Sequence, residues 1–135
     1  MLIIKEVEYA VMILDELYHE SPLSAAALST RRIIPSPFIY RVLKKLEARD
    51  ILEIRRGPKG GYSLKADCEK LTLYDVICAF ENTFIVTECL KSDYECVHNN
   101  DFNCRMHRQF AWIQHLLKEE FQKANLSSLL EEDPE

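Results

Sequence analysis

The sequence predicts a mainly α-helical fold with one small β-hairpin, and three observations lead to this fold class. Apolar residues recur at three- and four-residue spacing through much of the chain, as in amphipathic helices. All three glycines lie within residues 57–61, between two short runs that favour β-strands. A long apolar stripe follows Cys104 and predicts a long helix. The 135 residues suffice for one compact domain, or for a small domain with a dimerising appendage.

The first two helices are predicted on either side of a Ser-Pro break. From Lys5 to Tyr18 one helical face is apolar, with Val7, Ala10, Val11, Leu14 and Leu17. Ser21-Pro22 then breaks the chain. Ser24 is a suitable N-cap because its hydroxyl can accept from an unpaired backbone N–H, and it predicts a short helix through Thr30.

A third helix is predicted after a turn at Ile33–Ser36. Ser36 is expected as the N-cap and Pro37 as the first helical residue, because proline lacks a donor that the helix start leaves unpaired. The helix should run to about Arg49, with an inward stripe of Phe38, Ile39, Val42, Leu43 and Leu46. Its other face is cationic.

Two short strands are predicted next, at Ile51–Arg56 and Tyr62–Lys65. The loop between them holds every glycine of the chain, which indicates that its backbone shape requires glycine. Three helices followed by a hairpin are the order of a winged helix-turn-helix, assigned to residues 1–66.

In that arrangement the third helix enters the major groove of DNA and the hairpin reaches the adjacent backbone or minor groove. The residues predicted to contact DNA are Ser36, Tyr40, Arg41, Lys44, Arg55, Arg56 and Lys59. The alternative is that this winged helix serves as a protein–protein module.

The charge distribution favours double-stranded DNA as the partner although the net charge is -5. Residues 1–66 hold 11 Lys and Arg against 8 Asp and Glu, whereas residues 67–135 hold 6 against 14. Ten of the 11 basic residues lie between Arg31 and Lys65, where only three acidic residues oppose them. This segment is a candidate phosphate-facing patch, or else a set of solvated helical side chains.

Residues 67–103 are interpreted as a connecting helix and a cysteine-bearing loop. Thr72, with Asp75 three residues later, predicts a capped helix, and Cys68 and Cys78 are expected to be structural cysteines.

Residues 104–135 are interpreted as a dimerisation helix and a tail. The helix stripe contains Phe110, Ile113, Leu116, Leu117 and Phe121, with Trp112 nearby. So long a stripe has little of its own domain to pack against, so a homodimer is expected, which would read an inverted-repeat operator.

A soft-metal site is predicted at three cysteines within 16 residues: Cys89, Cys96 and Cys104. Iron–sulfur clusters and zinc both favour thiolate ligands, and a fourth ligand must complete the set. His107 is one candidate, because it follows Cys104 by three residues and would project from the same face of a helix.

No charged leader and no stretch near about 20 apolar residues is recognisable, so the chain is expected to be cytoplasmic and not membrane-bound. Five cysteines in a reducing compartment favour metal binding or burial over disulfides. An enzyme is not expected, because there is no Cys-x-x-Cys, no paired acid–base set and no phosphate-cradling loop.

Four parts of the chain carry a family resemblance: Tyr9-Ala10, Arg55 to Tyr62, Leu71 to Glu81, and the cysteines followed by His107. Together they resemble the winged-helix regulators called the Rrf-two family, in particular its iron–sulfur cluster-binding branch. The resemblance implies homodimeric transcription factors with a cluster near the dimer interface. It also implies a histidine ligand at His107 or, as in nitric-oxide sensors, a carboxylate from the partner subunit at Glu8.

The sequence departs from the family pattern at three places. Six residues separate Cys89 from Cys96 and seven separate Cys96 from Cys104, which is wider than usual in the family. Lys59 takes the place of a wing glycine, and Tyr40-Arg41 stand where the cluster regulators have an acidic and an amide residue. Cluster type, [2Fe-2S] or [4Fe-4S], and operator sequence are therefore not carried over.

Together with the patterns above, this resemblance implies a homodimeric DNA-binding regulator, a repressor, whose operator affinity is controlled by an iron–sulfur cluster and which senses redox state or nitric oxide. The alternative is a cofactor-free or zinc-containing winged-helix regulator that responds to a partner protein or to thiol oxidation.

Overall fold

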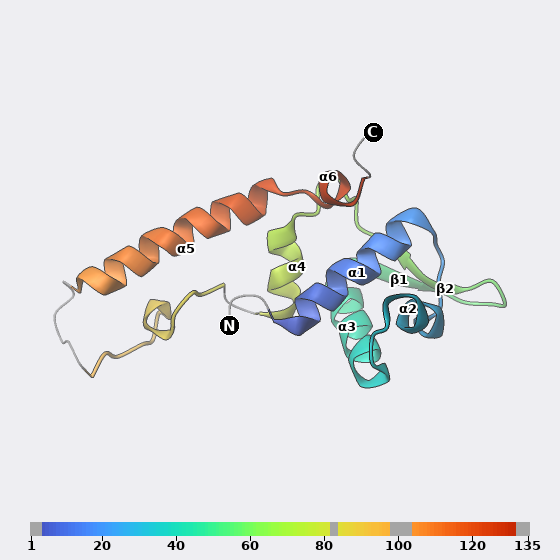
Figure 1. The fold of residues 1–135 in the computed structure, drawn as a ribbon, viewed down its shortest axis with the longest axis horizontal. Coiled ribbons are helices and arrows are strands. Elements are labelled where there is room, and N and C mark those ends of the chain that lie inside the picture. Colours follow the sequence, from blue (N-terminus) through green and yellow to red (C-terminus); the bar gives the residue numbers. More distant parts are fainter. Residues whose placement is uncertain (1–3, 82–83, 98–103, 132–135) are drawn as a thin grey trace.

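The computed structural model describes residues 4–81, 84–97 and 104–131. Its elements are α1 (Lys5–His19), α2 (Ala25–Arg32), α3 (Ser36–Ala48), β1 (Leu52–Arg55), β2 (Gly61–Leu64), α4 (Leu73–Phe80), the 3-10 helix η1 (Glu88–Leu90), α5 (Arg105–Lys123) and α6 (Leu126–Leu130). The mainly helical fold with one hairpin is therefore confirmed (Figure 1). Within these residues no helix is both long and apolar enough to cross a bilayer.

The core lies between α1, α2, α3, α4, α6 and the hairpin. Leu14 of α1, Leu28 of α2 and Leu43 of α3 are fully buried, because each helix turns its apolar stripe toward the others. Ser24 caps α2 as predicted, its hydroxyl accepting from the Ala27 N–H at 3.1 Å. α2 runs to Arg32, two residues beyond the predicted end.

The turn between α2 and α3 differs from the sequence prediction at Ser36. The N-cap of α3 is Pro35, and Ser36 is already helical. The backbone N–H groups of Phe38 and Ile39 both donate to the Pro35 carbonyl, at 2.9 and 3.1 Å, so the helix begins one residue earlier than predicted. Ser36 is therefore not a cap, and its side chain is exposed.

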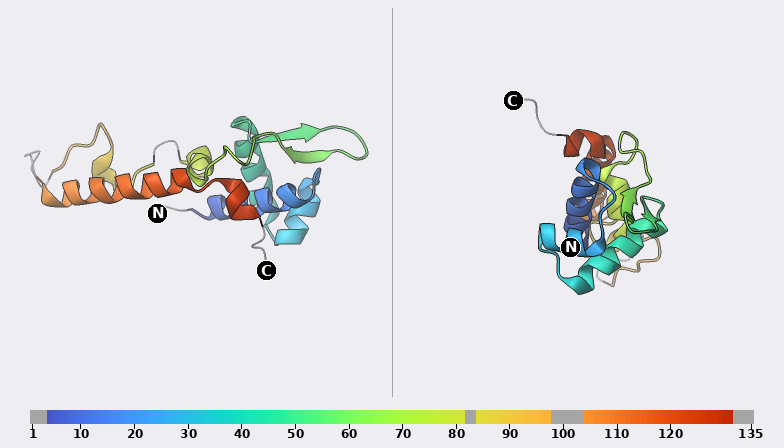
Figure 2. Two further views of the ribbon diagram at one scale, coloured as in Figure 1. Left: turned by 90° about the horizontal axis from the view of Figure 1, so that it is seen from above. Right: turned by 90° about the vertical axis from the view of Figure 1, so that its right-hand side faces the viewer.

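The hairpin is antiparallel and pairs Leu52 with Leu64 and Arg55 with Gly61. Its loop depends on glycine: a Cβ on Gly60 would overlap the Arg55 carbonyl oxygen, and Gly57 has φ +109°. The backbone of Tyr62 also pairs with Leu23, which ties β2 to the loop before α2. The tip projects from the body as a wing (Figures 1 and 2).

The C-terminal segment returns to the core. The Leu126 N–H donates to the Leu71 carbonyl at 2.9 Å, and the Ser127 N–H donates to the Cys68 carbonyl at 2.9 Å. Leu126 and Leu130 are buried in the same core as α1. The C-terminal segment therefore packs on α1 and on the residues before α4, and α6 anchors the end of α5.

α5 extends away from this body (Figures 1 and 2). None of its 19 residues is buried. Near its C-terminal end the Phe121 ring packs edge-on against Phe84, which packs against Tyr74 of α4. Farther along, the Gln114 side-chain oxygen accepts from the Val86 N–H at 2.8 Å, and η1 packs on the same helix.

Candidate nucleic-acid interface and cysteine segment

The outer face of α3 presents a polar and aromatic row. Ile39, Val42, Leu43 and Leu46 are buried on the inner face, whereas Ser36, Tyr40 and Lys44, spaced four residues apart, form an exposed row beside them. Tyr40 is 62% exposed although it is aromatic. An exposed aromatic between a hydroxyl and a cation is suited to contact base edges and phosphate.

Arg41, predicted in the same group, is paired within the protein. Its guanidinium donates to the Glu6 carboxylate of α1 at 3.1 Å and lies 5.4 Å from the centre of the Phe38 ring. Lys45 donates to the other Glu6 oxygen at 2.9 Å. Burial raises the pKa of the Glu6 carboxyl, but the bonds from Lys45 and Arg41 outweigh it and hold that pKa below its ordinary value. Glu6 is therefore charged at neutral pH.

The wing carries three exposed cations, Arg55, Arg56 and Lys59. Arg55 lies 3.7 Å from Glu53, which is a loose pair at the surface. Among the residues that the structure describes, Arg56 and Lys59 make no ion pair. Their charges are thus available to phosphates.

Other basic residues of the Arg31–Lys65 segment serve the fold. Arg31 pairs with Glu20 and Glu16, and Arg32 pairs with Asp15 and Glu16, so both join α2 to the end of α1. The local charge count had not revealed these partners, because they lie outside the segment. Its basic surface is consequently smaller than the count indicates and is concentrated on α3 and the wing.

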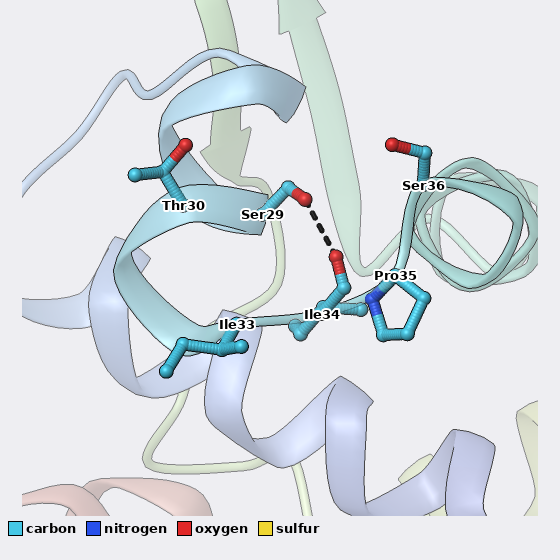
Figure 3. Close-up of a pocket in the computed structure, with 6 residues that line it drawn as sticks. All are labelled: Ser29, Thr30, Ile33, Ile34, Pro35 and Ser36. Carbon is cyan, nitrogen blue, oxygen red and sulfur yellow. Dashed lines mark hydrogen bonds between the residues drawn. The ribbon is translucent and has the colours of Figure 1, made fainter.

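A shallow depression lies beside the start of α3 and is lined by Ser29, Thr30, Ile33, Ile34, Pro35 and Ser36 (Figure 3). The Ser29 hydroxyl donates to the Ile34 carbonyl at 2.5 Å and closes the α2–α3 turn. This bond fixes the start of α3 relative to α2.

The three candidate cysteine ligands lie on three successive elements. Cys89 belongs to η1, Cys96 to the following loop, and Cys104 is the N-cap of α5. All three are free and half-buried. The Cys104 sulfur accepts from the backbone N–H of His107 at 3.4 Å, so the thiol and the histidine share the first turn of α5.

The donor set fits a soft-metal group in its chemistry, since three accessible thiols and an imidazole are ligands that iron and zinc accept. Across residues 4–81, 84–97 and 104–131, however, no three such donors are gathered around one point. Glu8 pairs with Lys5 of its own helix at 2.8 Å. Cys68 is buried, which raises the pKa of its thiol, and Cys78 is half-buried in α4.

The family model for Rrf2, described as an iron-dependent transcriptional regulator, matches residues 3–132 of the chain. The chain belongs to the Rrf2 family. It is accordingly a DNA-binding transcriptional regulator, and the winged helix described above is the fold of this family.

Curated relatives of this Rrf2 chain also have regulator names. A protein of Aquifex aeolicus, named as a proposed HTH-type transcriptional regulator, is 27% identical over 97 residues, which cover 72% of this chain and 67% of the relative. The HTH-type transcriptional regulator IscR of Vibrio campbellii is 32% identical over 84 residues, which cover 60% of this chain and half of the relative.

Among solved structures, this Rrf2 fold resembles CymR, described as the global cysteine regulator of B. subtilis. The TM-score is 0.74 at 21% identity, and the match covers 96% of both chains. At this identity the likeness establishes the fold alone.

Proposed function

We propose that this Rrf2 regulator is a homodimeric repressor of an inverted-repeat operator, and that an iron–sulfur cluster at Cys89, Cys96, Cys104 and a fourth ligand controls its affinity for that operator. The proposal divides the chain into residues 1–66 for DNA binding, 67–103 as connecting helix and cluster loop, and 104–135 as dimerisation helix and tail. Residues 98–103 of the loop lie outside the described residues.

The observation that carries the proposal is the position of α5. At one end it bears Cys104 and His107, and at the other it is anchored to the DNA-binding core through Phe121 and Leu126. A change in the cysteine segment or in the dimer contact can therefore alter how two recognition helices are held relative to each other.

The DNA surface is assigned to the outer row of α3 and the wing. Ser36 and Tyr40 lie near the start of α3, which is the part of a recognition helix that lies deepest in the major groove, so they would read bases. Lys44, Arg55, Arg56 and Lys59 would contact phosphates and position the duplex. Arg41 belongs to this surface only if it leaves Glu6.

Leu117 and Phe121 of the predicted stripe pack on the core of their own chain, so they are not free for a partner. Dimerisation is assigned to the exposed apolar residues of α5, Met106, Trp112 and Leu116. These side chains are 67%, 57% and 43% exposed, respectively. A second copy of the same helix would remove this surface from water, which is favourable in proportion to the apolar area buried.

The cluster ligands are assigned to Cys89, Cys96 and Cys104, with His107 or the partner subunit's Glu8 as the fourth. A bound cluster would supply a group that responds to iron supply, oxidation or nitric oxide. The protein's part is to bring the loop that carries Cys96 against η1 and the first turn of α5. A fourth ligand other than cysteine gives the site one coordination position that exchanges more readily, which suits a sensor.

The second candidate function is a regulator without a cluster, either zinc-containing or responsive to thiol oxidation or to a partner protein. It is favoured by the dispersed positions of the three thiols within the described part of the chain. Cys104→Ala and Cys89→Ala separate the two candidates. If these cysteines hold a cluster, each variant purified without oxygen should lack iron and acid-labile sulfide while it remains folded and dimeric. Iron and sulfide contents equal to those of the wild type would rule out these ligands.

The DNA surface is tested with Lys44→Ala and Lys59→Ala, on a duplex selected from a random-sequence library by the wild-type protein. Each lost phosphate contact should lower the slope of log affinity against log salt by about 0.9. Lys70→Ala is the matched control, because Lys70 is exposed in the segment before α4. Equal effects of all three substitutions would contradict the proposed surface.

A further inference from the structure

Glu6 connects the first turn of α1 to the recognition helix. One carboxylate oxygen accepts from Arg41 at 3.1 Å and the other from Lys45 at 2.9 Å. The Glu6 side chain is only 14% exposed, whereas that of Arg41 is 53% exposed. The anion is thus fixed in the α1–α3 contact, and the arginine reaches it from the surface.

Lys45 and Arg41 differ in how readily each can leave Glu6. Lys45 lies over the Phe80 ring at 5.3 Å, on the side of α3 that faces α4, so it belongs to the packing. Arg41 follows Tyr40 and precedes Lys44 by three residues, at the edge of the outer row. Rotation of its flexible side chain is enough to carry its guanidinium from Glu6 toward that row, without backbone movement.

A bound duplex offers Arg41 a stronger partner. Guanidinium makes paired hydrogen bonds to phosphate or to a guanine edge, and these are strong charge-assisted contacts. A half-exposed ion pair contributes little by comparison. DNA can therefore compete for Arg41, but the need to break the pair with Glu6 reduces the free energy gained on binding DNA.

We propose that Glu6 is a positioning residue that holds Arg41 off the recognition surface and releases it only to a duplex that offers a good partner. Glu6 thereby limits non-specific binding and raises sequence selectivity. This inference rests on the proposed use of α3 as the DNA-contacting helix.

Glu6→Gln tests the inference against Glu20→Gln. Glu20 also pairs with an arginine, Arg31 at 2.5 Å, but at the far end of α1. The two substitutions remove the same charge and one arginine pair each, and Glu6→Gln also removes the ion pair with Lys45. Glu6→Gln should tighten binding to a mixed-sequence duplex roughly two- to fivefold more than Glu20→Gln. For the Glu6→Gln protein the slope of log affinity against log salt should be steeper by about 0.9, because Arg41 then contacts a phosphate.

A double-mutant cycle assigns the effect to Arg41. Arg41→Ala should weaken binding more in the Glu6→Gln protein than in the wild type. Glu6→Asp keeps the charge but shortens the reach to Arg41, so it should also tighten binding; it serves equally if Glu6→Gln folds poorly. The inference would be overturned if Arg41→Ala lowers the affinity for DNA equally in both backgrounds, or if Glu6→Asp does not raise that affinity.

The failure of this inference is distinguishable from failure of the DNA surface. If Lys44→Ala weakens binding while the Glu6 variants behave like Glu20→Gln, only the role of Glu6 is refuted. If Lys44→Ala and Lys59→Ala also match Lys70→Ala, the recognition surface itself is refuted, and the role of Glu6 with it.

Discussion

Ile33 ends α2 in the left-handed conformation, with φ 54° and ψ 49°. This conformation is unfavourable for a β-branched residue by about 1–2 kcal/mol, and glycine or asparagine commonly occupies it at helix ends. Ile33 is also 87% exposed, so burial offsets none of that cost. The strain lies beside Ser36, at the start of α3.

Ile33→Gly should therefore stabilise the protein by about 0.5–1 kcal/mol, since glycine relieves the strain but loses more backbone entropy on folding. Thermal unfolding measures this as a higher midpoint. Ile34→Gly is the control, because Ile34 is buried and its loss should destabilise the fold. A lower midpoint for Ile33→Gly would contradict the assigned conformation.

For single residues, the sequence predicted which face of a helix a side chain occupies better than it predicted which residue that side chain contacts. The helical period placed Tyr40 and Lys44 on the outer face of α3, where the structure has them. Arg41 was placed with them, but its partner Glu6 lies 35 positions away in the sequence, and helical periodicity carries no information about such pairs. The burial of Ile13 was missed for a related reason, since it lies beside the predicted stripe and is covered by neighbouring elements.

Among the elements, α4 has the most complete start signal. The Thr72 hydroxyl accepts from the Asp75 N–H at 3.2 Å, and the Asp75 carboxylate accepts from the Thr72 N–H at 3.0 Å. This capping box satisfies two backbone donors at the start of α4. It was recognisable in the sequence because both residues lie within one turn.

Thr72→Ala should cost about 1 kcal/mol of stability, because the hydroxyl acceptor is lost. Thr72→Ser keeps the acceptor and should restore most of that stability. Denaturant unfolding of the three proteins compares them directly. A Ser variant as unstable as the Ala variant would show that the cap is not the stabilising contact.

Element boundaries were predicted less accurately than element types. β1 is one residue shorter than predicted at each end, whereas β2 has the predicted length but is shifted by one residue and begins at Gly61 instead of Tyr62. α3 begins at Ser36 because the Pro35 carbonyl accepts two backbone bonds. The first and last residues of an element depend on which backbone carbonyl in the adjoining turn accepts hydrogen bonds. The conformational preferences of the residues do not determine this choice.

For the whole molecule, α5 gives the clearest indication of assembly. An exposed face of Met106, Trp112 and Leu116 on a helix without buried residues is unfavourable in water for a single chain. Leu116→Glu should shift the proposed dimer to monomer by placing a charge in that contact. Sedimentation measures the change, with Gln122→Glu as the control on the same helix. A wild-type monomer, or a Leu116→Glu dimer, would refute this interface.

At this scale the sequence predicted the fold class and the family, because helix order, wing glycines and cysteine positions are all local patterns. It could not predict how the C-terminal segment packs. Leu126 and Leu130 lie in the core with α1, a contact between the two ends of the chain. The ligand geometry was likewise beyond the sequence, because it depends on how the loop with Cys96 meets η1 and α5.

The central claim is that a cluster at the cysteine segment controls operator affinity. The most direct measurement is the affinity of anaerobically purified protein for its selected operator before and after removal of the metal, with iron and acid-labile sulfide counted in both samples. The account predicts stoichiometric iron and sulfide at the start, and a change in affinity of roughly 5- to 150-fold on removal. Protein without iron and sulfide, or equal affinity in both states, would contradict it.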